Sequence, residues 1–178
     1  RRHDGFMKTT TNIQLVTNPP STEPDQPCRI VAADHPALDR DVDAFFGVLN
    51  AERRYFGPTA SANPKPFPSL LRALMERDGF RLAAIECGHV VGLVRIDQHG
   101  EMHIAVLADF RGLGIGTLLG KAALDRAIAL DYSRVVMRTT RRSKAARRAG
   151  EAMGCVVVEN ARGRTDLIAH LPNGLRSA

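Results

Sequence analysis

The chain has 178 residues, with 25 Lys and Arg against 19 Asp and Glu and a formal net charge of +6. This length suits one domain with its own hydrophobic core. No apolar run reaches the ~20 residues needed to cross a bilayer, and no apolar segment near the start predicts a secretory signal. The three cysteines, Cys28, Cys87 and Cys155, are widely spaced. They predict reduced thiols in a cytoplasmic protein without a membrane partner.

The first half of the chain predicts one strand and two helices. Residues 1–27 are rich in Thr, Asn, Pro and Ser without periodicity, which predicts a flexible tail. A strand over 29–32 precedes a helix that Asp34 caps, with Pro36 near its start. The apolar stripe of this helix recurs at helical spacing: Leu38, Val42, Phe45, Phe46 and Leu49. The proline-rich segment 57–68 predicts a loop, and 69–77 a short second helix.

The second half alternates strands with two more helices. The patterns predict strands over 81–86, 90–97, 101–107, 133–138, 155–159 and 165–170, with a turn at 87–89. Helices are expected over 117–130 and from Ser143 to about Met153. The order β, α, α, β, β, β, α, β, α, β, β predicts one α/β domain over 28–172, followed by a short tail, 173–178.

A glycine-rich loop joins the strand 101–107 to the helix 117–130: Arg111-Gly112-Leu113-Gly114-Ile115-Gly116. Glycine lets the backbone turn tightly and approach a ligand closely. The first amides of the helix lack internal partners, and the helix dipole adds positive charge there. These features predict a phosphate or diphosphate site. The alternative is a glycine-rich turn before an ordinary amphipathic helix.

The spacing of the glycines excludes two familiar phosphate loops. A dinucleotide fingerprint needs G-x-G-x-x-G, but Thr117 or Leu119 stands where the third glycine belongs. A Walker loop starting at Gly112 would need Lys where Leu118 stands. What remains is a basic residue followed by x-x-Gly-x-Gly.

This loop resembles the acetyl-CoA signature of GCN5-related N-acetyltransferases, the GNAT family. The resemblance implies a mixed, splayed central sheet of about seven strands with about four flanking helices. It implies that amides of 113–117 hold the CoA diphosphate, and that pantetheine fills a gap beside the strand 101–107. No metal is implied. The cofactor-binding residues implied are Ile104, Ala105, Val106, Arg111, Gly112, Leu113, Gly114, Ile115, Gly116, Thr117 and Ser143.

Glu101 and His103 are the candidate catalytic residues. An amine is protonated at neutral pH and must lose a proton before it attacks a thioester. Strand alternation puts Glu101 and His103 on the face opposite the apolar one, toward the cleft. Glu101 also resembles, in its distance from the loop, the catalytic Glu of bacterial protein lysine acetyltransferases. A solvated Glu101, a half-buried structural His103, or a loose metal trio completed by His99 are the alternatives.

Other residues support or weaken the resemblance to the lysine acetyltransferase branch of the family. Glu52-Arg53-Arg54-Tyr55-Phe56 looks like the Arg/Tyr/Phe-rich segment of the lysine acetyltransferases. Two positions depart from the family pattern. Ser143 stands where many members carry Asn, and Gly150 stands where many carry the Tyr that protonates the CoA thiolate.

The sequence therefore predicts an acetyl-CoA-dependent N-acetyltransferase, with a protein lysine favoured over a small-molecule amine. A non-catalytic acyl-CoA-binding regulatory module is the alternative, supported by the two departures. A cluster of basic residues admits nucleic-acid binding, but a CoA phosphate or a solvated face explains it as well. Both a monomer and a homodimer stay open. The cluster comprises Arg134, Arg138, Arg141, Arg142, Lys144, Arg147 and Arg148.

Overall fold

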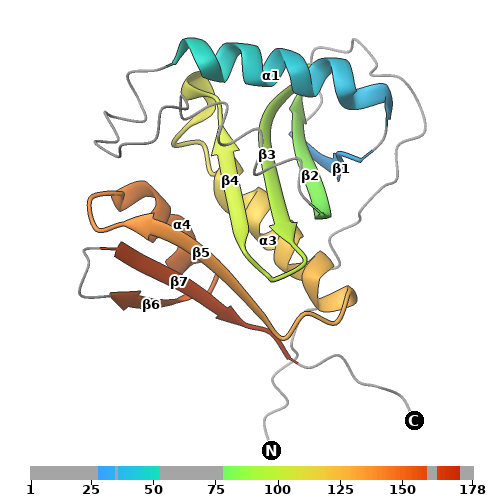
Figure 1. The fold of residues 1–178 in the computed structure, drawn as a ribbon. Helices are drawn as coiled ribbons and strands as arrows, with labels where there is room; N and C mark the ends of the chain where they lie inside the picture. The colour runs from blue at the N-terminus through green and yellow to red at the C-terminus, as the bar shows by residue number, and fades with distance from the viewer. Residues whose placement is uncertain (1–27, 35, 53–77, 160–163, 173–178) are drawn as a thin grey trace, which may run out of the picture.

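The computed structural model describes residues 28–34, 36–52, 78–159 and 164–172 (Figure 1). Its elements follow the expected order. They are β1 (Arg29–Ala32), α1 (Asp39–Ala51), β2 (Gly79–Glu86), β3 (His89–Asp97), β4 (Met102–Val106), α3 (Ile115–Ala129), β5 (Arg134–Thr140), α4 (Lys144–Ala152), β6 (Val156–Glu159) and β7 (Arg164–His170). Short 3-10 helices span Pro36–Leu38 and Ala108–Phe110.

The strands form two antiparallel sheets that diverge from one another (Figure 1). The first sheet has the order β1-β2-β3-β4, and the second has the order β5-β7-β6. A single parallel bridge, between Glu101 and Val136, links them. The mixed, splayed α/β sheet expected from the sequence is thus confirmed.

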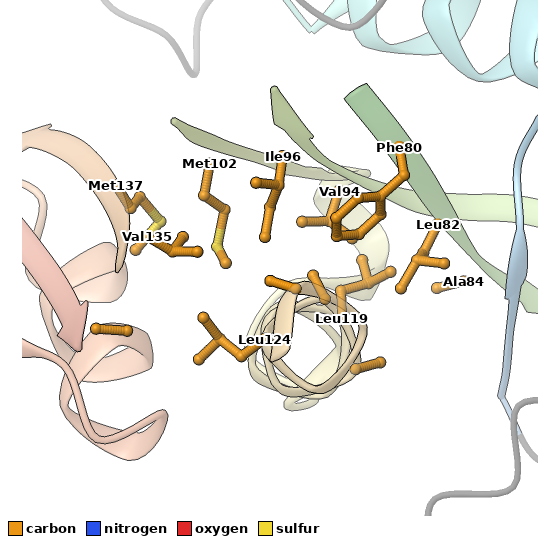
Figure 2. Close-up of a cluster of buried hydrophobic side chains, with 14 of the residues drawn as sticks. Phe80, Leu82, Ala84, Val94, Ile96, Met102, Leu119, Leu124, Val135 and Met137 are labelled. Carbon is orange, nitrogen blue, oxygen red and sulfur yellow. The ribbon is translucent and has the colours of Figure 1, made fainter. Parts of the chain in front are cut away.

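One core lies between α3 and the two sheets. Figure 2 shows Leu119 of α3 facing Phe80 and Leu82 of the first sheet, and Leu124 projecting from the side of the helix nearer the second sheet. Val135 and Met137 of β5 join the same cluster, so this core spans the split. Gly92 lets α3 approach β3, because a Cβ there would lie 2.8 Å from Leu119 Cδ1.

A second core lies on the opposite face of the first sheet, under α1. The predicted stripe of this helix is confirmed: Val42, Phe45, Phe46 and Leu49 are buried, and Leu38 packs against them. Phe45 and Phe46 meet edge to face, with ring centroids 5.4 Å apart. Ala105 of β4 belongs to this cluster, whereas Met102 belongs to the α3 cluster. The predicted alternation along β4 is therefore confirmed.

The predicted cap at Asp34 is wrong, whereas Ser143 does stand at the N-cap position of α4. Helix α1 starts at Asp39 after a 3-10 turn, and Asp34 instead accepts a hydrogen bond from Arg81 Nε at 3.0 Å. Ser143 does precede α4, but its side chain makes no capping bond. Local sequence favours such caps, whereas contacts between distant residues decide whether the oxygen is available.

The remaining expectations shift only at their ends or lie outside the described residues. Gly79, Phe80, Thr139 and Thr140 extend predicted strands, and α3 begins at Ile115 rather than 117. The turn between β2 and β3 is Cys87-Gly88, with positive φ at both residues, as a tight hairpin requires. The predicted tails, the loop 57–68 and the helix 69–77 fall on residues that are not described.

The three cysteines are free thiols. Burial raises the pKa of Cys155, and burial followed by the negative charge of Glu86 raises the pKa of Cys28. These two thiols therefore stay protonated at neutral pH. Within the described ranges, no helix combines the length and apolarity that crossing a bilayer requires.

Candidate active site at the split between the sheets

The split begins directly after the bridge between Glu101 and Val136. At the bridge, Val136 N donates to Gly100 O at 2.8 Å. Beyond it, β4 pairs with β3 alone, and β5 pairs with β7. The two strands then separate (Figure 1). The described strands thus leave one edge of β4 available to an extended ligand.

The backbone groups on that edge belong to Ile104 and Val106. Leu107 N donates to Val91 O, and Asp97 N donates to Glu101 O, so the odd-numbered residues of β4 bond to β3. Antiparallel pairing alternates along the strand. The peptide groups of Ile104 and Val106 therefore point away from β3, while those of Ala105 face Leu93. The carbonyl of Val106 accepts a bond from Arg111 Nε, so the N–H of Val106 and both groups of Ile104 are the ones directed at the gap. Of these three predicted cofactor residues, two present their backbone to the gap.

The glycine loop places the start of α3 beside this edge. Gly114 precedes the helix with φ +85°, and Gly112 has φ +81°, conformations that favour glycine. A Cβ at either position would meet nothing within 4 Å. The glycines therefore serve the shape of the turn and leave open space beside it. The first amides of a helix lack partners within the helix, and the anion site expected here stays a prediction.

Arg111 bonds to the end of β4 and to Glu52, which follows α1. Its Nε donates to Val106 O at 2.8 Å, and its Nη2 donates to Glu52 Oε2 at 2.6 Å. Glu52 Oε1 accepts a further bond from Ala108 N at 2.8 Å. Sequence reasoning assigned no role to this carboxylate, and its distance of 59 residues from Arg111 gave no local signal.

Glu101 and His103 lie together, as predicted, on the face of β4 that carries Ala105. Glu101 Oε1 and His103 Nε2 are 3.8 Å apart. Glu101 Oε2 forms an ion pair with Arg138 Nη1, 2.8 Å away. The side chains of Glu101 and His103 are 29% and 17% exposed, so solvent reaches both only in part. The partner Arg138 was not predicted.

A buried aspartate fixes the backbone at Glu101. Asp97 Oδ1 accepts bonds from the amides of His99 and Glu101, at 2.9 and 2.8 Å. The turn between β3 and β4 is thereby closed by a side chain as well as by the bond from Gly100 N to Asp97 O. The start of β4, where Glu101 sits, is consequently well defined.

The position where many family members carry a tyrosine has no room for one. Gly150 is buried, and a Cβ there would lie 2.7 Å from Leu167 Cδ1. Tyr132 packs against Phe80 in the core, and Tyr55 lies outside the described residues. Among the described residues, Tyr132 is thus a core side chain that also lies close to Gly100, and it does not occupy the position of the family's tyrosine.

Acidic side chains offset part of the basic cluster. Arg138 pairs with Glu101, Arg141 pairs with Glu159, and Arg147 pairs with both Glu151 and Glu159. Arg134, Arg142, Lys144 and Arg148 are exposed. Across the described ranges, no group of three His, Cys, Asp or Glu side chains is arranged to hold a metal ion. The trio His99, Glu101 and His103 is thus not such a group.

Known proteins share this sequence and architecture. The family model of the acetyltransferase (GNAT) family matches residues 45–163. Human N-acetylaspartate synthetase is 36% identical over 77 residues, which are 40% of this chain and 26% of that protein. The chain thus matches about a quarter of the length of this relative.

Solved structures show the same fold. A phosphinothricin acetyltransferase from Sinorhizobium meliloti, in complex with AcCoA, superposes with a TM-score of 0.64 at 15% identity, covering 85% of this chain and 92% of that one. yncA from Salmonella typhimurium, with its cofactor acetyl-CoA, has a TM-score of 0.62 at 18% identity, covering 86% and 99%. Because the family model covers more than half of the chain, the resemblance of the glycine loop is confirmed, and the protein belongs to the acetyltransferase (GNAT) family.

Proposed function

We propose that this protein is an acetyl-CoA-dependent N-acetyltransferase whose acceptor is a primary amine, with a protein lysine favoured. The observation that carries the proposal is the open edge of β4 beside the glycine turn at the start of α3. The outward N–H and C=O of Ile104 and the N–H of Val106 fit an extended pantetheine, while Val106 O is held by Arg111. The amides from Leu113 to Thr117 fit its diphosphate. Acetyl-CoA supplies the activated acyl group, and no metal is required.

Glu101 serves as the general base in this proposal. Its carboxylate takes a proton from the acceptor ammonium, directly or through one water. The neutral nitrogen then forms a bond to the acyl carbon while the carbon–sulfur bond breaks and the electron pair leaves on sulfur. The nitrogen, cationic after the attack, releases its second proton to water and becomes the amide nitrogen. His103, 3.8 Å from Glu101, contacts the acceptor or shares the proton. With glycine at position 150, the thiolate takes its proton from water.

The carboxylates on this face favour a cationic acceptor. Asp166 of β7 lies directly opposite Arg138, which pairs with Glu101. Asp166 Oδ1 is buried and has no hydrogen-bond partner among the described residues. Two carboxylates and one guanidinium therefore lie near each other by strand register, and their net negative charge favours a lysine ammonium over an anionic acceptor.

Two other functions have specific support. The name of the human relative refers to an acetylated amino acid, and the half-exposed Arg138 would suit the carboxylate of such an acceptor. Gly150 and Ser143 favour a non-catalytic acyl-CoA-binding module. These alternatives predict different products.

The test is incubation of the purified protein with acetyl-CoA and separate amine pools: lysine-containing peptides, free amino acids and polyamines. Chromatography would quantify released CoA and the acetylated amine. We expect release that depends on peptide lysine. CoA release only with free amino acids would mean that the acceptor is a free amino acid rather than a protein lysine. Tight CoA binding without release in any pool would support the regulatory module.

A further inference from the structure

We propose that Glu52 is a positioning residue that acts through Arg111 to hold the loop between β4 and α3 in its ligand-binding shape. The inference rests on the proposed function, because it concerns how the same acetyl-CoA loop is held. Glu52 uses both carboxylate oxygens on this loop, one on the amide of Ala108 and one on Arg111. These bonds tie the end of α1 to the start of the glycine loop.

The position of Glu52 is not explained by the stability of α1. It follows the last turn of that helix, where the dipole disfavours a negative charge. Its side chain is only 13% exposed, and that of Arg111 is 24% exposed. Burying a charge costs free energy unless a partner and hydrogen bonds compensate it. Among the described residues, the compensation comes from the loop, in the form of Ala108 N and the guanidinium of Arg111.

Arg111 fixes the loop at both of its ends. Its Nε binds Val106 O, at the last residue of β4, and its own amide donates to Ala108 O. Phe110 N also donates to Leu107 O. The segment 106–111 is therefore closed on itself and anchored to Glu52 immediately before the two glycines.

The described part of the chain gives the glycine turn itself little packing. A Cβ at Gly112 or Gly114 would meet nothing within 4 Å, and Leu113 is 67% exposed. Packing does not impose the left-handed conformations of this turn. The anchored segment on one side and α3 on the other must set the direction of the amides that a diphosphate would meet. Arg111 thus acts on the cofactor through the backbone, with its charge directed at Glu52.

The direction in which one substitution changes CoA affinity tests this role. Glu52→Gln keeps the shape but removes the charge, and CoA binding to the full chain is measured by titration calorimetry. We expect affinity to fall roughly tenfold, the value of about one charge-assisted hydrogen bond, with kcat at saturating acetyl-CoA within about twofold. If Arg111 were instead a phosphate ligand restrained by Glu52, the same substitution would free its charge and tighten binding. Unchanged or tighter binding overturns the proposal.

Matched variants separate positioning from general destabilisation. Glu151→Gln removes an exposed ion pair with Arg147 and should leave CoA affinity unchanged. The double variant Glu52→Gln and Arg111→Gln should bind CoA no more weakly than the weaker-binding of the two single variants, because the two residues act as one unit. Hydrogen exchange should accelerate over 107–117 while the interior of α3 keeps its protection. Equal acceleration in α3 would mean a merely structural role and would overturn the proposal.

Two further outcomes have defined meanings. If Glu52→Gln does not fold, the variant Arg111→Lys serves as the test instead. A lysine ammonium cannot bond both Val106 O and Glu52 with the geometry of a guanidinium. Full CoA affinity in that variant overturns the proposal. Wild-type protein that binds CoA without transferring acetyl groups contradicts the proposed function, yet leaves the loop anchor testable by affinity. Wild-type protein that binds no CoA overturns both.

Discussion

Glu101 and Arg138 join the two sheets by an ion pair, with 2.8 Å between Glu101 Oε2 and Arg138 Nη1. The pair lies just past the single backbone bridge, on the face that also carries His103. Arg138 is two residues beyond the bridged Val136, so it reaches back across the opening gap. The carboxylate proposed as the base is thus fixed by its backbone through Asp97 and by its side chain through Arg138.

Glu101→Gln should lower turnover by roughly 10²–10⁴-fold, the usual contribution of a general base. The amide keeps the size of the side chain and can still accept a hydrogen bond from Arg138, but it has no basicity. The apparent affinity for acetyl-CoA should hardly change, because Glu101 lies on the strand face turned away from α3. Steady-state kinetics with an acceptor found in the amine-pool assay would separate kcat from KM.

His103→Ala is the companion to that measurement. Near-wild-type turnover in Glu101→Gln, together with a large loss in His103→Ala, would identify the imidazole as the base. If neither substitution changes turnover, the amine loses its proton in bulk water, and the site only brings the two substrates together.

Arg138→Gln should lower kcat by roughly tenfold without changing the KM for acetyl-CoA, because a carboxylate released from its partner spends less time in the reactive geometry. Arg147→Gln is the matched control: it removes exposed ion pairs with Glu151 and Glu159, distant in sequence from Glu101. A higher kcat in Arg138→Gln would show the reverse, that the guanidinium restrains the base.

Gly114→Asp should abolish CoA binding, whereas Gly114→Asn should retain much of it. Both side chains tolerate the left-handed conformation, and a Cβ at this position meets nothing within 4 Å, so the backbone cost is similar. The two variants differ mainly in a negative charge beside the proposed diphosphate. Thermal shift with CoA measures the difference through mass action. Equal CoA-induced shifts in both folded variants would move the phosphate site elsewhere.

The sequence predicted those parts of the site that depend on local order. Glycine spacing located the turn before α3, and strand parity put Glu101 and His103 on one face, because a period of two residues decides which side chains share a face. Boundaries shifted by one or two residues at strand ends, where pairing with a neighbouring strand rather than propensity sets the length.

The contacts that hold the site could not be predicted. Glu52 meets Arg111 across 59 residues, and Arg138 reaches Glu101 only because β4 and β5 touch at one bridge and then part. A periodic pattern carries no information on which surface arginine faces which carboxylate. The same reason explains Asp34, whose local pattern indicated a helix cap and whose actual partner is Arg81 on β2.

Two helical glycines should respond oppositely to alanine. Gly47 of α1 is exposed, and a Cβ there meets nothing within 4 Å, so Gly47→Ala should stabilise the fold by roughly 0.5–1 kcal/mol through helix propensity. At Gly150 of α4 the same gain is opposed by Leu167, three of whose side-chain atoms would lie within about 3.1 Å of the new Cβ. Leu167 is fully buried and has little space to yield.

Overpacking of this kind typically costs about 1–3 kcal/mol, more than the propensity gain, so Gly150→Ala should lower the free energy of unfolding. Urea denaturation of both variants measures the contrast, and adding Leu167→Val to Gly150→Ala should recover part of the loss. A Gly150→Ala protein as stable as Gly47→Ala would mean that α4 can move off the second sheet. A tyrosine could then be accommodated at position 150, and Gly150→Tyr would become a direct test of whether the missing acid limits turnover.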